Sequence, residues 1–234
     1  KEKQAMALFD IHMTYQLDSD VPVAYPNWTE YGGFMEEPAP LHVKNDMNSI
    51  ALYVASNPIS YRDDYVSELM EYINVDSVGK CLNNKTISGI SRGTEGQGES
   101  RYPDLTSLIR NYKFYLAFEN SCSRDYVTEK VFMALNAGAV PVYCGAENIH
   151  EFMPDDDAVI HIDRFNSPKE LADYLLYLDQ NDDEYMKHLA WKSSGYNNRF
   201  KNLVDASSIH SLHRMFVKLA HGCGHECNCG GRLR

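Results

Sequence analysis

Long apolar runs are missing from this sequence of 234 residues. No stretch is long and apolar enough to cross a membrane, and no signal peptide is visible. An excess of positive charge is missing too, because 33 acidic residues outnumber 22 lysines and arginines and give a net charge of −11. This charge argues against nucleic acid as a partner. Any anionic ligand must therefore be held by local positive charge and not by the overall field of the protein.

A phosphate-binding P-loop is also missing. Glycines gather in residues 80–103, but no lysine follows them in the register of a P-loop, and the surrounding Ser, Thr and Glu residues indicate a flexible loop. No internal repeat is visible. A hydrophobic content of 44% over this length is enough to bury one good core or two small ones.

The most informative stretch is YKFYLAFENSCSRDYVTEKVFMALNAGAVPVYCG, residues 112–145. It predicts a strand over residues 112–118, a helix over 128–138 and a second strand over 140–144. Asp125 or Thr128 can cap the start of the helix, and Gly138 stands where a helix stops. The pattern is that of a βαβ unit with a right-handed crossover.

The loop between the first strand and the helix, ENSCSRDYVTEK, is polar although apolar segments flank it. Such loops open onto a helix N-terminus, where open parallel sheets bind ligands. Lys130 adds positive charge, Asn120, Ser121 and Tyr126 can donate hydrogen bonds, and Glu129 can accept them from sugar hydroxyls. Spacing alone leaves two interpretations open: a site for a phosphorylated ligand, or a solvated loop with an ordinary Lys–Glu pair.

A second strand, loop and helix lie earlier in the chain. Residues 49–55 predict a strand, Ser56 and Asn57 follow it, and residues 61–74 have helical spacing. Arg62 lies in the first turn, where a cation fits the helix dipole poorly. It either pairs with a neighbouring acid, Asp63 or Asp64, or binds an anion.

The remaining pattern alternates strands with helices and predicts an α/β fold with a Rossmann-like parallel sheet flanked by helices. Ser167, Pro168 and Glu170 form a predicted capping box. The other predicted elements are the end of a helix over residues 1–10, strands over 9–14, 75–79 and 158–162, and helices over 104–111, from 167, from 181 and over 200–219.

Six cysteines and two glycosylation sequons, which begin at Asn27 and Asn84, suggest a secretory compartment. Cys223, Cys227 and Cys229 crowd the end of the chain, with His221 and His225 nearby. The paired C-x-x-C elements of zinc sites are lacking, so disulfides are favoured and zinc remains the alternative.

The stretch FYLAFENSCSRDYVTEKVFMALNAGAVPVYCG resembles the donor-binding signature of the α1,3-fucosyltransferases of glycosyltransferase family 10. The resemblance extends to MTYQLDSDVPVAYPNW, to VASNPISYR and to FNSPKELADYLLYLDQNDDEYMKHLAWK, and so covers nearly the whole chain. Two stretches, SDVPVAYPNW and FKNLVDASSIHS, look more like the plant-type core α1,3-fucosyltransferases. The resemblance implies a GT-B architecture and inverting, metal-independent transfer of fucose from GDP-fucose.

The resemblance also implies roles for individual residues. Arg62 and Lys130 stabilise the departing diphosphate, and Glu129 holds the fucose hydroxyls and favours positive charge at the sugar ring. These three are the predicted catalytic residues. The predicted donor contacts are Ser56, Asn57, Arg62, Tyr115, Asn120, Ser121, Tyr126, Glu129 and Lys130, with Tyr115 and Tyr126 as walls of the pocket.

Two other interpretations are weighed against this one. Asp18 and Asp20 form an aspartate–x–aspartate pair that holds Mn²⁺ against a diphosphate in another large class of nucleotide-sugar transferases. Such pairs are commoner as turn and cap residues. We therefore expect no required metal and treat Mn²⁺ only as a potential stimulator. The other interpretation is a non-catalytic module that binds a sugar nucleotide or a glycan.

The predicted organisation has three parts: a junction over residues 1–40, a GDP-fucose-binding domain over 41–222 and a Cys-rich tail over 223–234. In the enzymes resembled, the general base lies upstream of the TYxxDSD element, so we expect it to be missing from this chain. The resemblance further implies the Golgi lumen, a membrane anchor before Lys1, and a glycan or glycoprotein acceptor. The plant-like stretches favour the 3-hydroxyl of N-acetylglucosamine in the N-glycan core.

Overall fold

A five-stranded parallel sheet organises the computed structural model, which describes residues 11–86 and 102–222. The strand order is β4-β3-β5-β6-β7. The strands are β3 (Ala51–Ala55), β4 (Val75–Gly79), β5 (Phe114–Phe118), β6 (Val140–Cys144) and β7 (Ile160–His161). All four pairings are parallel, so every strand ends at the same edge of the sheet. The predicted α/β fold with a Rossmann-like sheet is confirmed.

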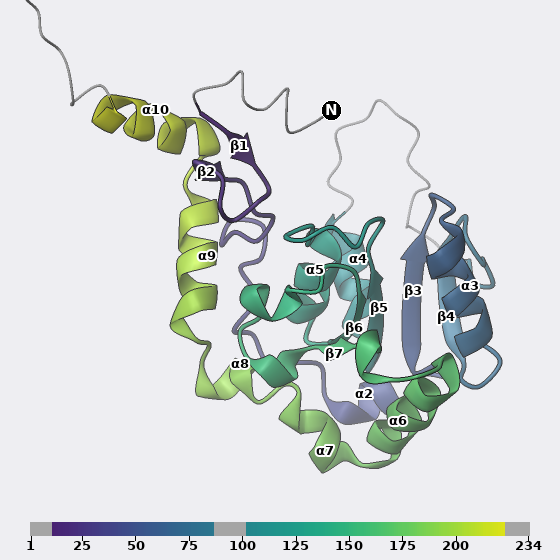
Figure 1. Ribbon diagram of the computed structural model, residues 1–234. Helices are drawn as coiled ribbons and strands as arrows, with labels where there is room; N and C mark the ends of the chain where they lie inside the picture. The colour runs from purple at the N-terminus through teal and green to yellow at the C-terminus, as the bar shows by residue number, and fades with distance from the viewer. Residues whose placement is uncertain (1–10, 87–101, 223–234) are drawn as a thin grey trace, which may run out of the picture.

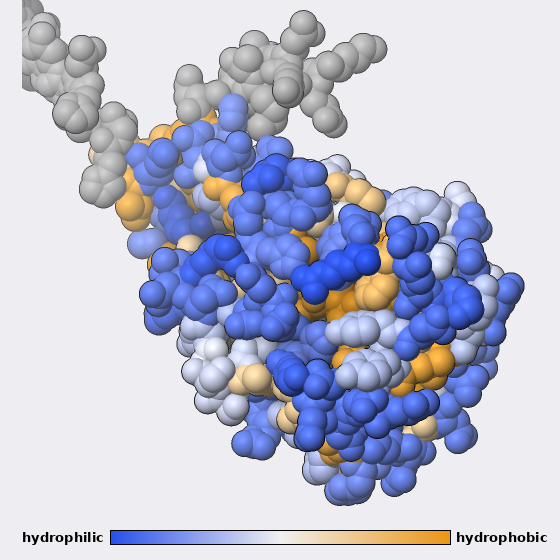
Figure 2. Space-filling model, turned by 60° about the horizontal axis from the view of Figure 1, so that its bottom comes forward, coloured by the Kyte–Doolittle hydropathy of each residue, from blue (hydrophilic) through white to orange (hydrophobic). Residues whose placement is uncertain are grey.

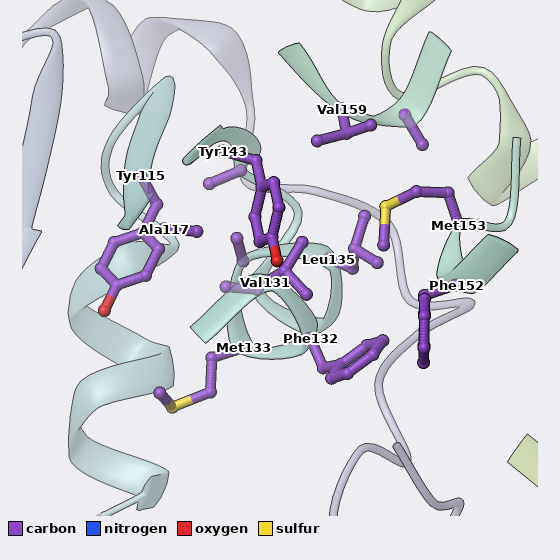
Figure 3. Packing of buried hydrophobic residues seen from close by; sticks show 14 of the residues in the cluster. Tyr115, Ala117, Val131, Phe132, Met133, Leu135, Tyr143, Phe152, Met153 and Val159 are labelled. Carbon is purple, nitrogen blue, oxygen red and sulfur yellow. The ribbon is translucent and has the colours of Figure 1, made fainter. Parts of the chain in front are cut away.

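Alternate side chains of the strands pack into two hydrophobic cores, one on each face of the sheet. On β5, Phe114, Leu116 and Phe118 enter one core, whereas Tyr115 and Ala117 enter the other. All five are at most 1% exposed. A strand covered on both faces has no polar face, which explains the nearly continuous apolar run FYLAF. Figure 3 shows the core that Tyr115 and Tyr143 share with side chains of α5.

Helices cover both faces of the sheet and complete three layers (Figure 1). The α3 and α6 helices pack together on one face, and α4 and α5 pack together on the other. The longer helices are α3 (Ser60–Leu69), α4 (Tyr102–Ile109), α5 (Glu129–Ala137), α6 (Pro168–Gln180), α9 (Asn198–Ser208) and α10 (Ser211–Gly222). Shorter turns are α2 (Leu41–Asn45), α7 (Asp182–Lys187), α8 (Trp191–Ser194), η1 (Ile149–Phe152), η2 (Asp156–Ala158) and η3 (Ile162–Arg164).

Two predicted helix boundaries are confirmed in detail. Ser167 caps α6, since its Oγ accepts from the backbone N–H of Glu170 at 3.2 Å. Gly138 ends α5 in the left-handed conformation with φ of 71°. The predicted caps of α5 are not used as such. Thr128 stands at the N-cap position, but its hydroxyl bonds to Glu119 and Lys130 and does not cap the helix. The Asp125 carboxylate is held by Asn148 and by the Leu17 N–H.

The predicted helix over residues 200–219 is wrong as a single element. Two helices, α9 and α10, replace it, and the chain between them is extended at Ile209, with φ of −87° and ψ of 125°. The Nδ1 atom of His210 accepts from the backbone N–H of Leu212 at 3.3 Å at the start of α10. The break follows Ser207 and Ser208, and serine competes with helical hydrogen bonding through its own hydroxyl.

The N-terminal segment is tied to the rest of the fold. Its short strands β1 (Met13–Thr14) and β2 (Val21–Pro22) lie beside α10 (Figure 1). Further along, Tyr31 and Phe34 are 4% and 0% exposed and enter the core that contains α5. The segment predicted as a junction therefore shares the core of the domain that follows it.

Three predictions lie outside the described residues: the helix over residues 1–10, the loop character of residues 87–101, and the pairing or zinc binding of Cys223, Cys227 and Cys229. The other three cysteines are described. Cys81, Cys122 and Cys144 are free thiols, so the expected disulfides are not formed among them.

The face shown in Figure 2 is mainly hydrophilic, with apolar side chains in small patches. Within residues 11–86 and 102–222, no helix is long and apolar enough to cross a membrane.

Candidate functional site

The candidate site lies where the order of strands along the chain reverses. From β3 the chain moves to β4 on one side, and β5 then pairs with β3 on the other side. Open α/β sheets bind ligands at this switch point, in the crevice beyond the carboxyl ends of the strands. The two predicted loops, residues 56–59 after β3 and 119–128 after β5, therefore border the same crevice.

Arg62 joins these two loops. Its Nη2 donates to the carbonyl oxygen of Asn57 at 2.5 Å, and its Nη1 donates to Oδ1 of Asn120 at 2.7 Å. Its Nε forms an ion pair with Oδ1 of Asp63 at 3.3 Å, so the predicted alternative of a neighbouring acid is also realised. The residue is only 1% exposed. Three of its five N–H groups thus hold protein acceptors, and the guanidinium fixes the walls of the crevice.

Lys130 lies in the first turn of α5, as predicted, but it is not alone there. Its Nζ donates to Oε2 of Glu119 and to Oγ1 of Thr128, both at 3.0 Å. Its side chain is 14% exposed. Glu129 comes next to it with a 30% exposed side chain, and its Oε1 is 3.7 Å from the Lys130 Nζ. A cation and a more exposed carboxylate are therefore neighbours at the N-terminus of α5, as the sequence predicts.

The remaining predicted contacts divide into two groups. Ser56, Asn57 and Asn120 are exposed, and Ser121 is half-buried with its Oγ 2.8 Å from Oγ of Ser123. Tyr115 differs from the prediction, because its side chain is 1% exposed and packs in the core. In this structure Tyr115 does not wall an open pocket.

Tyr126 is half-buried and packs edge-on against Tyr15, with ring centroids 5.6 Å apart. The residue before it, Asp125, has φ of 64°, which side chains other than glycine seldom adopt. The Asn148 side chain holds it there, accepting from the Asp125 N–H at 3.0 Å and donating to Oδ1 at 2.8 Å. Oδ2 of Asp125 accepts from the Leu17 N–H at 3.2 Å. The loop of residues 119–128 after β5, called the donor loop below because the sequence predicts donor contacts in it, is thereby held to the turn after β6 and to the N-terminal segment.

Sequence reasoning missed Glu119, Tyr61 and the pair of Asp125 with Asn148. Glu119 is fully buried and contacts Thr128 and Lys130, and the Tyr61 hydroxyl donates to its carbonyl oxygen at 2.9 Å. A signal was present for Glu119, because a carboxylate directly after a buried strand is expensive to bury without a partner. The other contacts join distant segments and leave no local pattern.

Asp20 contacts two other parts of the fold. Its Oδ2 accepts from the His12 N–H at 3.0 Å, and its Oδ1 pairs with Nζ of Lys218 at 3.2 Å. In the described part of the chain, no group of three or more His, Cys, Asp or Glu side chains could hold a metal ion.

A shallow hollow of about 610 Å³ lies elsewhere, lined by Asn45, Tyr177 and residues 179–184, four of them acidic. Lys113, which precedes β5, pairs with two of these acids, Asp179 and Asp182. The hollow is thus near the amino ends of the strands, opposite the switch point. Its carboxylates would repel a diphosphate, so we exclude it as the donor site.

Comparison with known proteins decides the family. The family described as "Glycosyltransferase family 10 (fucosyltransferase) C-term" matches residues 21–222. The chain belongs to glycosyltransferase family 10. The resemblance seen in the sequence is therefore confirmed at the level of the family.

Relatives of this family-10 chain include GDP-fucose protein O-fucosyltransferase 3 of Danio rerio, 44% identical over 158 residues, or 65% of this chain and 34% of the relative. A putative fucosyltransferase-like protein of Arabidopsis thaliana is 36% identical over 214 residues, or 91% of this chain and 38% of the relative. The chain thus spans about a third of the length of these relatives.

Solved structures of an α1,3-fucosyltransferase share the fold. The structure with GDP has a TM-score of 0.56 at 23% identity, and the structure with GDP-fucose has a TM-score of 0.54 at 21% identity. Each match covers 82% of this chain and 53% of the other chain. The likeness shows that this chain shares the fold of these GT-B enzymes.

Proposed function

We propose that this chain is the donor-binding half of an inverting fucosyltransferase and that it binds GDP-fucose at the switch point between β3 and β5. The observation that carries the proposal is the Lys130 ammonium at the N-terminus of α5, beside a crevice of a family-10 domain whose two loops Arg62 joins. Preorganised cations stabilise the charge that develops on a departing diphosphate more than they stabilise the ground state. Glu129, more exposed and next to Lys130, is the proposed partner of the fucose hydroxyls and of the developing positive charge at the ring.

The test of donor binding is a calorimetric titration of the chain with GDP-fucose in EDTA, repeated with GDP-mannose. We expect saturable binding that prefers GDP-fucose and does not need a metal, with Mn²⁺ at most a stimulator. Lys130→Ala should weaken binding by about 1.5–3 kcal/mol, as for hydrogen bonds to charged groups. Lys201→Ala on the exposed side of α9 is the matched control, since it removes a lysine far from the crevice. Unchanged affinity in folded Lys130→Ala would refute the assignment.

For the acceptor, we propose a protein-linked hydroxyl group. The relatives named GDP-fucose protein O-fucosyltransferase 3 support a hydroxyl on a polypeptide, whereas the stretches resembling plant-type enzymes support the 3-hydroxyl of N-acetylglucosamine in the N-glycan core. The two acceptors can be distinguished by whether fucose from labelled GDP-fucose is attached to the polypeptide or to its N-glycan. Full-length protein, labelled GDP-fucose and a glycoprotein acceptor with or without its N-glycans separate them, because loss of labelling on glycan removal favours the N-glycan core.

We further propose that the general base lies in an upstream half of the full-length protein. We also propose that this protein acts in the lumen of the Golgi and that a membrane anchor precedes residue 1. Both amide atoms of Asn84 are hydrogen-bonded to β4, at 2.7 Å to Ser77 and 2.8 Å to Val75, so Asn27 is the sequon better placed to carry a glycan there. If the full-length protein binds GDP-fucose but transfers no fucose to any acceptor, a non-catalytic binding module replaces this proposal.

A further inference from the structure

Glu119 is the first residue after β5, and its side chain is fully buried at the edge where the donor is proposed to bind. Its Oε1 accepts from the Thr128 N–H at 2.7 Å, and its Oε2 accepts from the Thr128 hydroxyl at 2.7 Å and from the Lys130 ammonium at 3.0 Å. Both carboxylate oxygens are therefore used within the protein. The carboxylate stands beside the N-terminus of α5, where an anion is favoured by the helix dipole.

The main chain of Glu119 is fixed as firmly as its side chain. Its N–H donates to the carbonyl oxygen of Cys144 at 2.7 Å, and its carbonyl accepts from the Tyr61 hydroxyl at 2.9 Å. On the side of β6, a Cβ added to Gly145 would lie 2.8 Å from Cγ of Glu119 and 2.4 Å from the Tyr143 hydroxyl. No side chain fits there, so the backbone of Gly145 packs directly against Glu119.

A buried carboxylate is expensive unless a cation and hydrogen-bond donors compensate it. Burial raises the pKa of the Glu119 carboxyl, and the Lys130 ammonium and the Thr128 donors oppose this effect. Lys130 is the cation that compensates Glu119, and the two charges therefore depend on each other. Removing either one leaves the other buried without its partner.

The contacts of Lys130 determine how many of its N–H donors remain for a ligand. An ammonium has three N–H donors, and Glu119 and Thr128 take one each. Two acceptors at 3.0 Å hold the ammonium in one place, which removes the rotamer freedom that a lysine otherwise loses when it binds an anion. One N–H is left, with Glu129 Oε1 at 3.7 Å as the neighbour.

We propose that Glu119 is a positioning residue that holds the Lys130 ammonium against the donor diphosphate without touching the donor itself. The inference rests on the proposed function, because it requires that Lys130 bind the diphosphate. The inference predicts that Glu119 contributes to donor binding only when Lys130 is present. A merely structural Glu119 would instead stabilise the sheet edge whether or not Lys130 is present.

The test is a double-mutant cycle on the affinity of the chain for GDP, with Glu119→Gln, Lys130→Met and the double variant. We expect Lys130→Met and Glu119→Gln each to weaken GDP binding by about tenfold or more. In the Lys130→Met background, Glu119→Gln should cost less than about twofold, because its route to the donor is already lost. Equal costs in the two backgrounds would overturn the inference.

Two controls separate positioning from folding. Asp76→Asn removes a largely buried carboxylate that pairs with Lys85 and Tyr112 near the amino edge of the same sheet, so it should lower stability and leave GDP affinity unchanged. Thr128→Val removes the hydroxyl that bridges Glu119 and Lys130, and Thr128→Ser restores it. We expect Thr128→Val to weaken GDP binding and Thr128→Ser to approach the wild type. Thr128→Val therefore tests the inference even if Glu119→Gln does not fold, and wild-type affinity in Thr128→Val would contradict it.

Failure of this inference is distinguishable from failure of the proposed function. If the wild-type chain binds no GDP-fucose, or if Lys130→Met binds GDP as well as the wild type, the proposed function fails and the inference fails with it. If Lys130→Met weakens binding and Glu119→Gln does not, the donor site stands and only the positioning role of Glu119 is wrong.

Discussion

Arg62 of α3 donates from Nη1 to Oδ1 of Asn120 at 2.7 Å and so connects the two loops at the switch point of the sheet. These residues are 58 positions apart in the chain. Because Arg62 is only 1% exposed, the bond is also the one that satisfies its Nη1 in a buried position. The same contact therefore joins the two loops and satisfies a buried donor, while Asp63 supplies the opposite charge.

Asn120→Ala should lower the free energy of unfolding by about 1–3 kcal/mol, because it leaves a buried charged donor without its acceptor. Urea denaturation measures the change. Asn57→Ala is the matched control, since Arg62 contacts only the main-chain oxygen of Asn57 and keeps that bond. The control should stay within about 0.5 kcal/mol of the wild type, as for surface substitutions. Equal losses in both variants would contradict this account of Arg62.

Asn148→Ala should release the donor loop from the turn after β6. The substitution removes two hydrogen bonds to Asp125, at 3.0 and 2.8 Å, and leaves the left-handed conformation of Asp125 without its support. We expect a loss of about 2–4 kcal/mol in the free energy of unfolding for two buried hydrogen bonds, and faster cleavage by trypsin after Arg124 in the loop.

Glu147→Ala is the control for Asn148→Ala. Glu147 is adjacent in sequence, its side chain is 80% exposed, and its Oε1 is 3.9 Å from Nη1 of Arg124. Such a surface pair contributes little to stability. If tryptic cleavage after Arg124 is no faster in Asn148→Ala than in Glu147→Ala, the clamp on the loop is refuted.

The sheet and its helices are predictable from the sequence because their signals are local. The strands β4 and β6 have the predicted bounds. For β6 the reason is that an apolar run buried on both faces stands out against its polar flanks. The end of α5 is predictable from Gly138 alone, because glycine tolerates the left-handed conformation. The break at Ile209 is not predictable from periodicity, since the apolar residues of α9 and α10 continue the helical spacing across it.

The candidate site is predictable only in part, for a related physical reason. Lys130, Glu129 and Arg62 stand at sequence positions that a strand, loop and helix pattern singles out. What these residues contact depends on which loops the sheet brings together. The bonds of Lys130 to Glu119 and of Arg62 to Asn120 span 11 and 58 positions, and no periodicity reports them. The buried position of Tyr115 follows from its place inside β5, where alternation points it into the core.

The stability of the chain should depend on pH through Lys44. Burial, together with repulsion from Arg110, Lys192 and Lys113, lowers the pKa of Lys44 to about 7. The pKa of an unfolded lysine is about 10.4, so between these values the unfolded chain binds one more proton than the folded chain. The contribution of Lys44 to stability is therefore present at high pH and is lost as the pH falls toward about 7.

Lys44→Met tests this dependence. The difference in the free energy of unfolding between the wild type and Lys44→Met should shift in favour of the wild type from about pH 7.5 to 9.5, by at most about 1.4 kcal/mol per pH unit. Lys169→Met on the exposed face of α6 is the control, because the pKa of Lys169 is raised by Asp173 and lies above this window. A flat difference for Lys44→Met would contradict the lowered pKa.

Two glycines with positive φ, Gly138 and Gly195, differ in what an added side chain would meet. Gly138 has φ of 71°, and a Cβ there would lie 2.8 Å from both Cα and Cβ of Pro38. Gly195 has φ of 97°, and a Cβ there would meet nothing within 4 Å. Gly195→Ala should therefore cost only the strain of a backbone with positive φ and ψ of 171°, about 1–3 kcal/mol. Gly138→Ala should cost at least about 1 kcal/mol more, since Pro38 or α5 must shift to admit the methyl group.

Denaturation of both variants under one condition measures the difference in the free energy of unfolding. Equal losses would mean that the segment around Pro38 moves freely, which its neighbour Phe34, fully buried in the core, argues against.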